Sequence, residues 1–307
     1  MTSSHPSPRG AGRFAPSPSG PLHLGNLRTA LLAWLFARST GRRFLLRVED
    51  LDADRSRFAG QQLDELQSLG LTWDGEPVYQ SDRLPLYREA LDVLREAGHV
   101  YECFCSRREI RQAASAPHSP VRRYPGTCRN LTDAEVRQRR RDRAPALRLR
   151  TDASTGTVHD LVAGVHRAAL DDMVLQRRDG TPAYNLAVVV DDAACGIDQV
   201  VRADDLLDSA VSQAYLAGLL DLPVPEYAHV PLAVGRSGRR LAKRDGDVTL
   251  ERLAARGRSA QWALDLIASS LSGAVAARPG RSPAQLLDSF DPALLPAGPW
   301  SVPTELP

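Results

Sequence analysis

The segment that most constrains this chain is "RFAPSPSGPLHLGNLRTALLAWLFA", which spans residues 13–37. A loop of small residues and prolines leads here into an apolar stripe with the spacing of a buried helix face. Gly41 then suits the left-handed position that ends a helix. Because a helix N-terminus has unpaired N–H groups and partial positive charge, the loop predicts an anion site, such as one for a phosphate. The apolar positions of the stripe are Leu27, Ala30, Leu31, Trp34 and Leu35.

A predicted strand follows, because the segment 44–48 is a short run of mostly apolar residues. Glu49 and Asp50 stand at its C-terminal end, and ligands of open α/β sheets bind beyond the carboxyl ends of the strands. These carboxylates are therefore candidate site residues, although charged residues also commonly solvate the end of a strand. Two helices are predicted next, over 58–70 and 84–98, each closed by a glycine.

The composition is that of a globular protein: 43% of the 307 residues are hydrophobic and 25% are charged. A formal net charge of +2 gives no global attraction for nucleic acid, so RNA binding would need local patches. No apolar run reaches transmembrane length, and residues 1–12 lack the apolar core of a signal peptide, so we expect no membrane partner and a disordered leader over 1–12. Four cysteines are too few for a disulfide framework, which favours a cytoplasmic location.

Changes in composition divide the rest of the chain. Residues 13–99 are predicted to form the first half of an α/β domain, and 100–181, with three of the four cysteines and a basic run, an inserted subdomain. Strand-like segments at 183–197 and 199–207 and a helix over 209–220 then resume the α/β pattern within 182–248. Residues 249–307 are expected to form a helical part and a tail.

One basic residue stands apart, because Lys243 is the only lysine among 39 basic residues. His23 at the helix start could grip a phosphate, and a compact, mobile ammonium could stabilise the charge that develops on a leaving pyrophosphate. Such a pair suits nucleotidyl transfer to a carboxylate, which needs positioning and electrostatics rather than a covalent nucleophile. The alternatives are a lysine left by chance and a histidine that only caps its helix.

Together, "HLGN" and "RLAKR" resemble the "HIGH" and "KMSKS" signatures of class I aminoacyl-tRNA synthetases. The words "RFAPSPSGPLHLGNLRTAL", "LLRVEDLDADRS", "LGLTWDGEPVYQSDRLPLYREAL" and "PAYNLAVVVDD" resemble the catalytic core of glutamyl-tRNA synthetases over residues 13–250. The resemblance implies a Rossmann-type α/β catalytic domain of class I. Arg240 and Ala242 stand where the second signature usually has Lys and Ser, so this loop is expected to close on ATP less tightly, whereas Lys243 matches the second lysine of the signature.

Glutamyl-tRNA synthetases usually carry an anticodon-binding domain, and none is expected here because the chain is too short to hold one. This architecture resembles the glutamyl-queuosine tRNA(Asp) synthetase family. The resemblance implies that a monomer activates glutamate with ATP and Mg²⁺, without tRNA, and transfers it to the queuosine in the anticodon of tRNA(Asp). The alternatives are a truncated glutamyl-tRNA synthetase that charges a tRNA 3′ end and a non-catalytic tRNA-binding paralogue.

The resemblance also implies the site residues. His23 and Lys243 would be catalytic and would bind ATP together with Gly25 and Asn26. Two arginines and one acidic residue complement the two carboxylates and the ammonium of glutamate, and which arginine takes the side-chain carboxylate stays open. The implied glutamate-binding residues are Arg13, Phe14, Ala15, Pro16, Ser17, Glu49, Tyr184 and Arg202.

One Zn²⁺ per chain is implied as well, held in the insertion. As bare spacing, three cysteines and a tyrosine could equally be half-buried side chains, so the zinc expectation rests on the resemblance. The implied ligands are Cys103, Cys105, Tyr124 and Cys128, while Cys195 is expected to be a small buried hydrophobe. The run Arg137, Arg139, Arg140 and Arg141 is predicted to be a solvated helix face and only secondarily an RNA contact.

Overall fold

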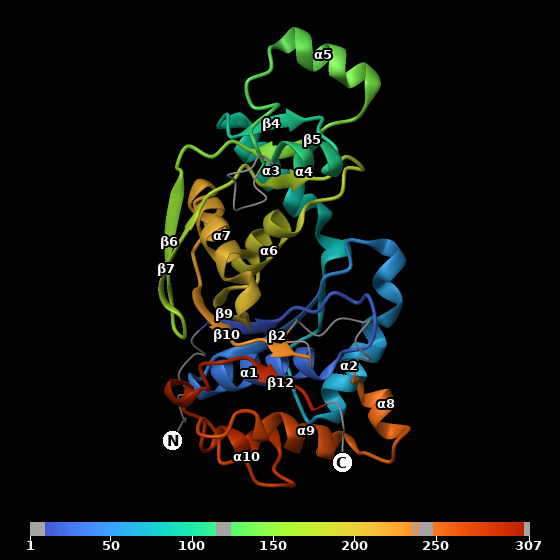
Figure 1. Ribbon diagram of the computed structural model, residues 1–307, viewed down its shortest axis with the longest axis vertical. Helices are drawn as coiled ribbons and strands as arrows, with labels where there is room; N and C mark the ends of the chain where they lie inside the picture. Colours follow the sequence, from blue (N-terminus) through green and yellow to red (C-terminus); the bar gives the residue numbers. More distant parts are fainter. Residues whose placement is uncertain (1–9, 115–123, 236–237, 239–247, 304–307) are drawn as a thin grey trace, which may run out of the picture.

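The computed structural model describes residues 10–114, 124–235, 238 and 248–303. Its main element is a seven-stranded sheet in which all neighbouring strands are parallel except the last two (Figure 1). This Rossmann-like arrangement with a mixed sheet agrees with the predicted α/β class. In sheet order the strands are β3 (Val78–Tyr79), β2 (Arg43–Val48), β1 (Ala11–Phe14), β9 (Ile197–Ala203), β10 (Glu226–Val230), β6 (Thr155–Asp160) and β7 (Gly164–Ala169).

Helix α1 (Leu24–Ser39) lies against one face of the sheet and forms the centre of the largest core cluster. Its close approach to β1 requires Gly12, because a Cβ there would lie 2.9 Å from the Cβ of Ala37. Gly41 has φ 72° just beyond the helix, which confirms the predicted helix end. The predicted strand after it and the two predicted helices are also confirmed, as β2, α2 (Ala59–Ser68) and α3 (Leu84–Glu96).

Helices α6 (Tyr184–Ala194) and α7 (Leu207–Leu219) cover the opposite face of the sheet (Figure 1). The predicted strand over 183–197 is therefore wrong, because most of that segment is α6 and only its last residue belongs to β9. Residues 186–190 are a short, buried and entirely apolar run, which the sequence alone does not distinguish from a buried strand. The predicted helix over 209–220 is confirmed as α7.

The segment 100–181 divides between two sheets. A small antiparallel sheet is formed by β4 (Val100–Cys103), β5 (Ala146–Leu149) and β8 (Val174–Gln176). The same segment also contains the helices α4 (Arg107–Ala114) and α5 (Asp133–Asp142). Strands β6 and β7, however, extend the main sheet beside β10. The expected inserted subdomain therefore includes a hairpin that belongs structurally to the main sheet.

Both ends of the described chain pack against the body. Ala11 and Gly12 belong to β1, and Ala11 is fully buried, so the disordered leader predicted for 1–12 is wrong at these positions. The C-terminal part is helical as predicted, but it also contains a short strand that pairs with an earlier strand of the chain. Its elements are α8 (Leu250–Ala254), α9 (Ala260–Ser269), α10 (Pro283–Leu287) and β12 (Trp300–Ser301), which pairs with β11 (Ala233–Val234). Short 3₁₀ helices lie at Ala53–Phe58, Gln80–Arg83, Asp204–Leu206 and Pro292–Leu294.

Within the described ranges, no helix has both the length and the apolar character needed to cross a membrane.

Candidate active site

The candidate glutamate residues gather at the carboxyl ends of neighbouring parallel strands. Arg13 lies near the end of β1, Glu49 directly follows β2, and Arg202 lies near the end of β9. These three strands are adjacent, in the order β2-β1-β9. The arrangement confirms that the strand-end carboxylate lies at the edge where α/β sheets bind ligands.

The loop after β1 is held against the end of β2. The backbone N–H of Glu49 donates to the carbonyl oxygen of Pro16 at 3.0 Å, and the Gln62 amide donates to the carbonyl oxygens of Ser17 and Gly20 at 3.1 and 2.7 Å. Gln62, on α2, was not predicted, and nothing in its own segment distinguishes it. Of the loop residues expected to bind glutamate, Phe14 and Pro16 are buried, Ala15 is half-buried and Ser17 is exposed.

Arg13 is buried and already has a carboxylate partner. Its Nε donates to Asp192 Oδ1 at 3.2 Å, and Arg47 Nη1 donates to the same oxygen at 2.5 Å. Burial raises the pKa of Asp192, but the charges of Arg13 and Arg47 outweigh burial and lower that pKa below its ordinary value. Asp192 is therefore ionised and shared between two guanidinium groups.

Asp191 and Arg47 also belong to this buried network, and neither they nor Asp192 were predicted from the sequence. Asp191 accepts from Arg83 Nε at 2.6 Å and from the Tyr87 hydroxyl at 2.8 Å, and its Oδ2 lies 3.8 Å from Arg47 Nε. Arg47 Nη2 also donates to Glu49 Oε1 at 3.4 Å. Burial is the largest influence on Glu49 and raises its pKa despite the nearby arginines. Two adjacent aspartates at the end of the apolar run "LAVVVDD" were the available signal.

Arg202 differs from Arg13, because its partners are neutral groups. It is 5% exposed, and its Nε donates to His229 Nε2 at 3.0 Å. Its Nη1 donates to Gln213 Oε1 at 2.8 Å and more weakly to the Tyr184 hydroxyl at 3.4 Å. Among the residues that the structure describes, no carboxylate oxygen lies within 4.0 Å of this guanidinium.

His229 is completely buried and accompanied by Asp160. Its Nδ1 lies 2.6 Å from Asp160 Oδ2, and its backbone N–H donates to the same carboxylate. Burial lowers the pKa of His229 below its ordinary value in spite of that carboxylate, so the imidazole is neutral. Burial raises the pKa of Asp160, but hydrogen bonds from His229 and from two backbone N–H groups outweigh it and lower that pKa. Neither residue was predicted.

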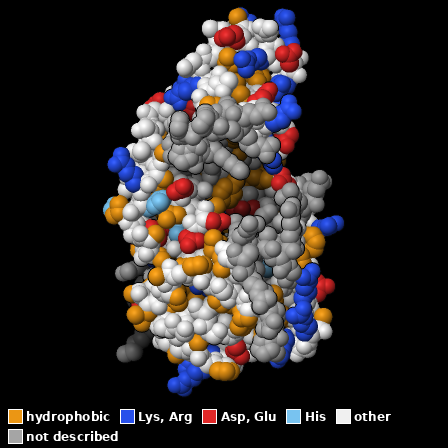
Figure 2. Space-filling view, in the orientation of Figure 1, with side chains coloured by type: hydrophobic (Ala, Val, Ile, Leu, Met, Phe, Trp, Pro, Cys, Tyr) orange, Lys and Arg blue, Asp and Glu red, His pale blue; other side chains and the backbone are white. Residues whose placement is uncertain are grey.

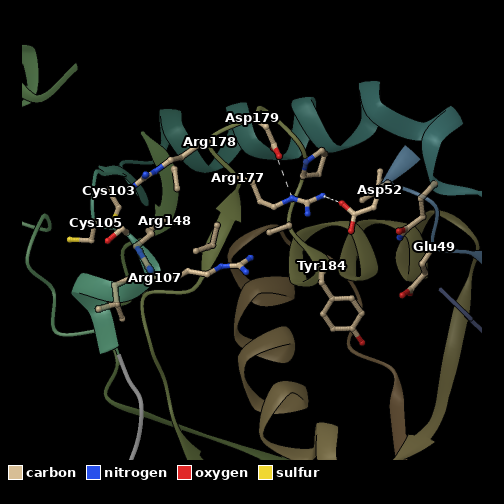
Figure 3. Close-up of a pocket in the computed structure, with 18 of the residues that line it drawn as sticks. Glu49, Asp52, Cys103, Cys105, Arg107, Arg148, Arg177, Arg178, Asp179 and Tyr184 are labelled. Carbon is tan, nitrogen blue, oxygen red and sulfur yellow. Dashed lines mark hydrogen bonds and ion pairs between the residues drawn. The ribbon is translucent and has the colours of Figure 1, made fainter. Parts of the chain in front are cut away.

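A cavity of about 760 Å³ opens above these strand ends. Ser17, Glu49 and Tyr184 line one part of it, while Arg13 and Arg202 are not among its lining residues. Figure 3 shows Glu49 and Tyr184 on one side of the cavity, with Cys103 and Cys105 on the other. Because its volume exceeds that of one amino acid, the cavity has room for a second reactant.

Arginines line the other part of the cavity. Arg107 on α4, Arg148 on β5 and Arg178 after β8 all come from the segment 100–181 (Figure 3). Arg178 Nη2 donates to the Phe104 carbonyl oxygen at 2.6 Å and Arg148 Nη1 to the Asp172 carbonyl oxygen at 2.5 Å, so neither charge is neutralised by these contacts. Arg177 lies here too but pairs with Asp52 and Asp179, so the positive charge offered to an anionic group comes from the other three arginines.

The first signature forms the start of α1. His23 Nδ1 accepts from the Asn26 backbone N–H at 3.2 Å, and Asn26 Oδ1 accepts from the His23 backbone N–H at 3.3 Å. A Cβ on Gly25 would lie 3.0 Å from the Cβ of Ala233 and from the His23 ring, so the signature glycine permits close packing here. Lys243, Arg240 and Ala242 lie outside the described residues. Val248, just after them, accepts from the Leu24 backbone N–H at 3.0 Å.

The four expected zinc ligands lie together. The Tyr124 hydroxyl is 3.4 Å from Cys103 Sγ and 3.9 Å from Cys105 Sγ, which is itself 3.6 Å from Cys128 Sγ. The three sulfur atoms all lie within 4.8 Å of one another. Three sulfur donors and one oxygen donor around a tetrahedral Zn²⁺ are separated by about 3.5–3.8 Å when the Zn–S and Zn–O distances are about 2.3 and 2.0 Å, so this cluster fits the ion. Cys195, by contrast, is a half-buried free thiol that packs against a hydrophobic core cluster, as expected for a small hydrophobe.

Helix α5 carries the basic run, and none of its residues is buried, which confirms the predicted solvated face. Figure 2 shows basic and acidic side chains intermingled at this end of the molecule. Arg140 pairs with Glu102, and Arg139 Nη1 lies 3.8 Å from Cys128 Sγ. Part of the positive charge of the basic run is therefore compensated by groups of the protein itself.

Comparison with known proteins agrees with this geometry. Residues 11–267 match the family described as tRNA synthetases class I (E and Q), catalytic domain. A glutamyl-Q tRNA(Asp) synthetase of Nocardia farcinica is 59% identical over 292 residues, which cover 95% of this chain and 92% of the relative. One of Symbiobacterium thermophilum is 46% identical over 311 residues and covers 96% of each chain.

A solved structure is similar as well. The glutamate tRNA ligase from Elizabethkingia meningosepticum, in complex with its amino acid, has a TM-score of 0.82 and 25% identity, covering 97% of this chain and 68% of that chain. The names of these relatives support glutamate activation and tRNA glutamylation. The chain therefore belongs to the class I tRNA synthetases (E and Q) and is a ligase of that type, similar over most of its length to glutamyl-Q tRNA(Asp) synthetases.

Proposed function

We propose that this protein activates glutamate with ATP, without tRNA, and transfers it to the queuosine in the anticodon of tRNA(Asp). The observation that carries the amino-acid part is the buried guanidinium of Arg202, whose described partners are neutral. A buried cation without a counter-ion is costly, so the pocket favours a ligand with a carboxylate. Glu49, half-buried at the same edge, complements the ammonium group of that ligand.

The ATP-binding group proposed is His23, Gly25, Asn26 and Lys243, with Mg²⁺ accompanying the nucleotide. The N-terminus of α1 supports it, because the positive end of the dipole of a 16-residue helix favours an anion such as a phosphate. The contact of Val248 with Leu24 supports it as well, since the chain leaves the second signature beside the first. Lys243 would stabilise the charge on the departing pyrophosphate.

Zinc would be held by the sulfur atoms of Cys103, Cys105 and Cys128 and by the Tyr124 oxygen. The separations of the four donor atoms support this assignment. Four protein ligands leave no open position for water, so the ion would stabilise the small sheet and the loop 124–128 rather than take part in the reaction.

The RNA substrate is supported by the second half of the cavity. Arg107, Arg148 and Arg178 line it, and the phosphate backbone of an RNA is the polyanion that such a lining suits. The names of the most similar relatives specify tRNA(Asp) and support queuosine as the acceptor. A monomer in the cytoplasm, where tRNA is found, completes the proposal.

The decisive experiment incubates the protein with ATP, labelled glutamate and three RNAs: tRNA(Asp) with queuosine, tRNA(Asp) without it, and queuosine-bearing tRNA(Asp) that lacks its 3′-terminal adenosine. We expect label on the first and third RNAs only. Label on the first two but not on the third would instead show charging of the 3′ end. Absence of glutamate-dependent pyrophosphate exchange without tRNA would indicate a non-catalytic tRNA-binding paralogue.

Amino-acid choice gives a second test. Exchange with glutamate should far exceed exchange with glutamine or aspartate, because a buried guanidinium left without its carboxylate is costly. Replacement of Arg13 or Arg202 by Ala should remove most of the exchange with glutamate. Equal activation of glutamine by the wild-type protein would contradict the proposed pocket.

A further inference from the structure

Three neighbouring strands contribute one side chain each to a buried chain of hydrogen bonds. Arg202 on β9 is the direct register partner of His229 on β10, and Asp160 is the last residue of β6, which pairs with β10 at Tyr227. The side chains of His229 and Asp160 are completely buried. The order Asp160–His229–Arg202 therefore runs across the sheet toward the edge of the proposed glutamate pocket.

The chemistry of the three groups determines where the imidazole proton lies. Arg202 Nε has one hydrogen and can only donate, so His229 Nε2, at 3.0 Å, must accept through its lone pair. The single proton of the neutral imidazole then belongs to Nδ1, which donates to Asp160 Oδ2 at 2.6 Å. Asp160 thus selects the tautomer in which His229 can accept from Arg202.

A carboxylate in the place of His229 would also orient the guanidinium, but it would neutralise the charge. Arg13 shows that arrangement in the same protein, because its Nε donates to Asp192 Oδ1. The imidazole orients Arg202 equally well and leaves its positive charge available to a ligand. The other acceptors, Gln213 at 2.8 Å, the Leu206 carbonyl at 3.3 Å and the Tyr184 hydroxyl at 3.4 Å, are neutral too.

We propose that Asp160 and His229 are positioning residues for amino-acid selection: they hold Arg202 in place through a neutral acceptor and so reserve its charge for a carboxylate of the amino-acid substrate. The proposal rests on the proposed function in that glutamate is taken as the amino acid. It adds two residues that do not line the cavity and act only through Arg202.

Asp160→Asn is the principal test. The amide keeps an oxygen for the backbone N–H groups, but its NH₂ group now faces His229 Nδ1 and favours the tautomer with the proton on Nε2. That proton would oppose the N–H of Arg202. We expect the KM for glutamate in pyrophosphate exchange to rise roughly 10- to 100-fold, the loss typical of a hydrogen bond to a charged group, while the KM for ATP stays unchanged.

A second variant separates positioning from general loss of structure. His229→Gln places an amide oxygen near the position that Nε2 occupies in the wild type. This oxygen can accept from Arg202 with either Asp or Asn at position 160. In the Asp160→Asn background, His229→Gln should therefore restore much of the affinity for glutamate. His229→Asn, whose shorter side chain reaches Asp160 but not Arg202, should behave like Asp160→Asn. The control is Asp152→Asn, which alters an exposed His–Asp pair, with 3.6 Å between His99 Nδ1 and Asp152 Oδ2.

Imidazole ¹⁵N NMR identifies the tautomer of His229 directly. Calorimetry without ATP measures the affinity for glutamate independently of catalysis. We expect the proton of His229 on Nδ1 in the wild-type protein and on Nε2 in Asp160→Asn. An Nε2 proton in the wild type, or wild-type glutamate affinity in Asp160→Asn, would overturn the inference. Absence of exchange with bound glutamate would count against the proposed activation but not against the positioning role, whereas absence of glutamate binding by the wild type would overturn both.

Discussion

Asp192 connects two buried arginines, so its charge should matter more to stability than that of any exposed carboxylate. Its Oδ1 accepts from Arg13 Nε at 3.2 Å and from Arg47 Nη1 at 2.5 Å, and its side chain is only 8% exposed. Asp192→Asn preserves the shape and one acceptor oxygen but removes the negative charge. Two guanidinium groups would then be left in the interior with less compensation than before.

The expected cost follows from this geometry. Removing one partner from a buried ion pair destabilises proteins by about 3–5 kcal/mol, because the remaining charge stays in a medium of low polarity. At about 2.1 cal/mol/K of unfolding entropy per residue, 1 kcal/mol lowers the melting temperature of a 307-residue chain by about 1.5 °C, so Asp192→Asn should melt roughly 5–8 °C below the wild type. Glutamate-dependent exchange should also fall, because Arg13 loses the group that fixes its Nε.

Urea unfolding followed by circular dichroism at pH 7.5 measures the expected loss of free energy of unfolding. The matched control is Asp92→Asn, which removes the charge of an exposed pair with Arg95, whose side chains are 61% and 52% exposed respectively. Exposed pairs contribute little, so this control should unfold almost as the wild type does. If Asp192→Asn were as stable as the control, the buried network would not hold the strand ends together, and the reasoning would be refuted.

Four other outcomes are expected. Lys243→Ala should lower exchange by about 100- to 1000-fold at unchanged melting temperature, and Lys243→Arg should be impaired too; wild-type exchange in the latter would make the single lysine an accident of composition. Metal analysis should find one zinc per chain and less after Tyr124→Phe; well-folded protein without zinc would refute the site. Arg107→Ala should slow transfer to RNA but not exchange, unlike Arg108→Ala on the same helix; equal transfer rates would contradict the RNA contact. Because the pKa of Asp192 is lowered by folding, its stabilisation is present above about pH 4 and lost below, so wild type and Asp192→Asn should converge in stability in acid; a constant difference would count against it.

Elements with a one-sided apolar pattern could be predicted from the sequence. Helix α3 buries only Tyr87, Ala90, Leu91 and Leu94, at helical spacing, and its limits agree closely with the prediction. Helix α6 was misassigned because residues 186–190, packed between the sheet and neighbouring helices, form a short run in which every residue is apolar. Burial on all sides removes the contrast between faces on which such a prediction depends.

Some residues of the candidate site could likewise be predicted from the sequence, and others could not. His23, Glu49 and the cysteines stand in short words or at strand ends, so local sequence and resemblance were sufficient to propose them. The contacts that orient the pocket are long-range: Arg13 and Asp192 are 179 residues apart, and Asp160 and His229 are 69 apart. Asp160 and His229 lie in unremarkable segments, and only the pairing of β6 with β10 brings them together. Arg13 and Asp192 meet because helix α6 packs against the sheet.

The hairpin formed by β6 and β7 limits how far this protein can be treated as separable modules. It comes from the segment 100–181, yet it pairs with β10 and contributes Asp160, which is hydrogen-bonded to the His229 that holds Arg202. Excision of 100–181, or its exchange for the corresponding segment of a relative, would leave β10 as an open edge strand, a common starting point for aggregation. It would also remove a support of the amino-acid pocket. A change of RNA specificity by domain grafting would therefore need a junction that spares residues 155–169 and replaces only the small sheet with α4 and α5.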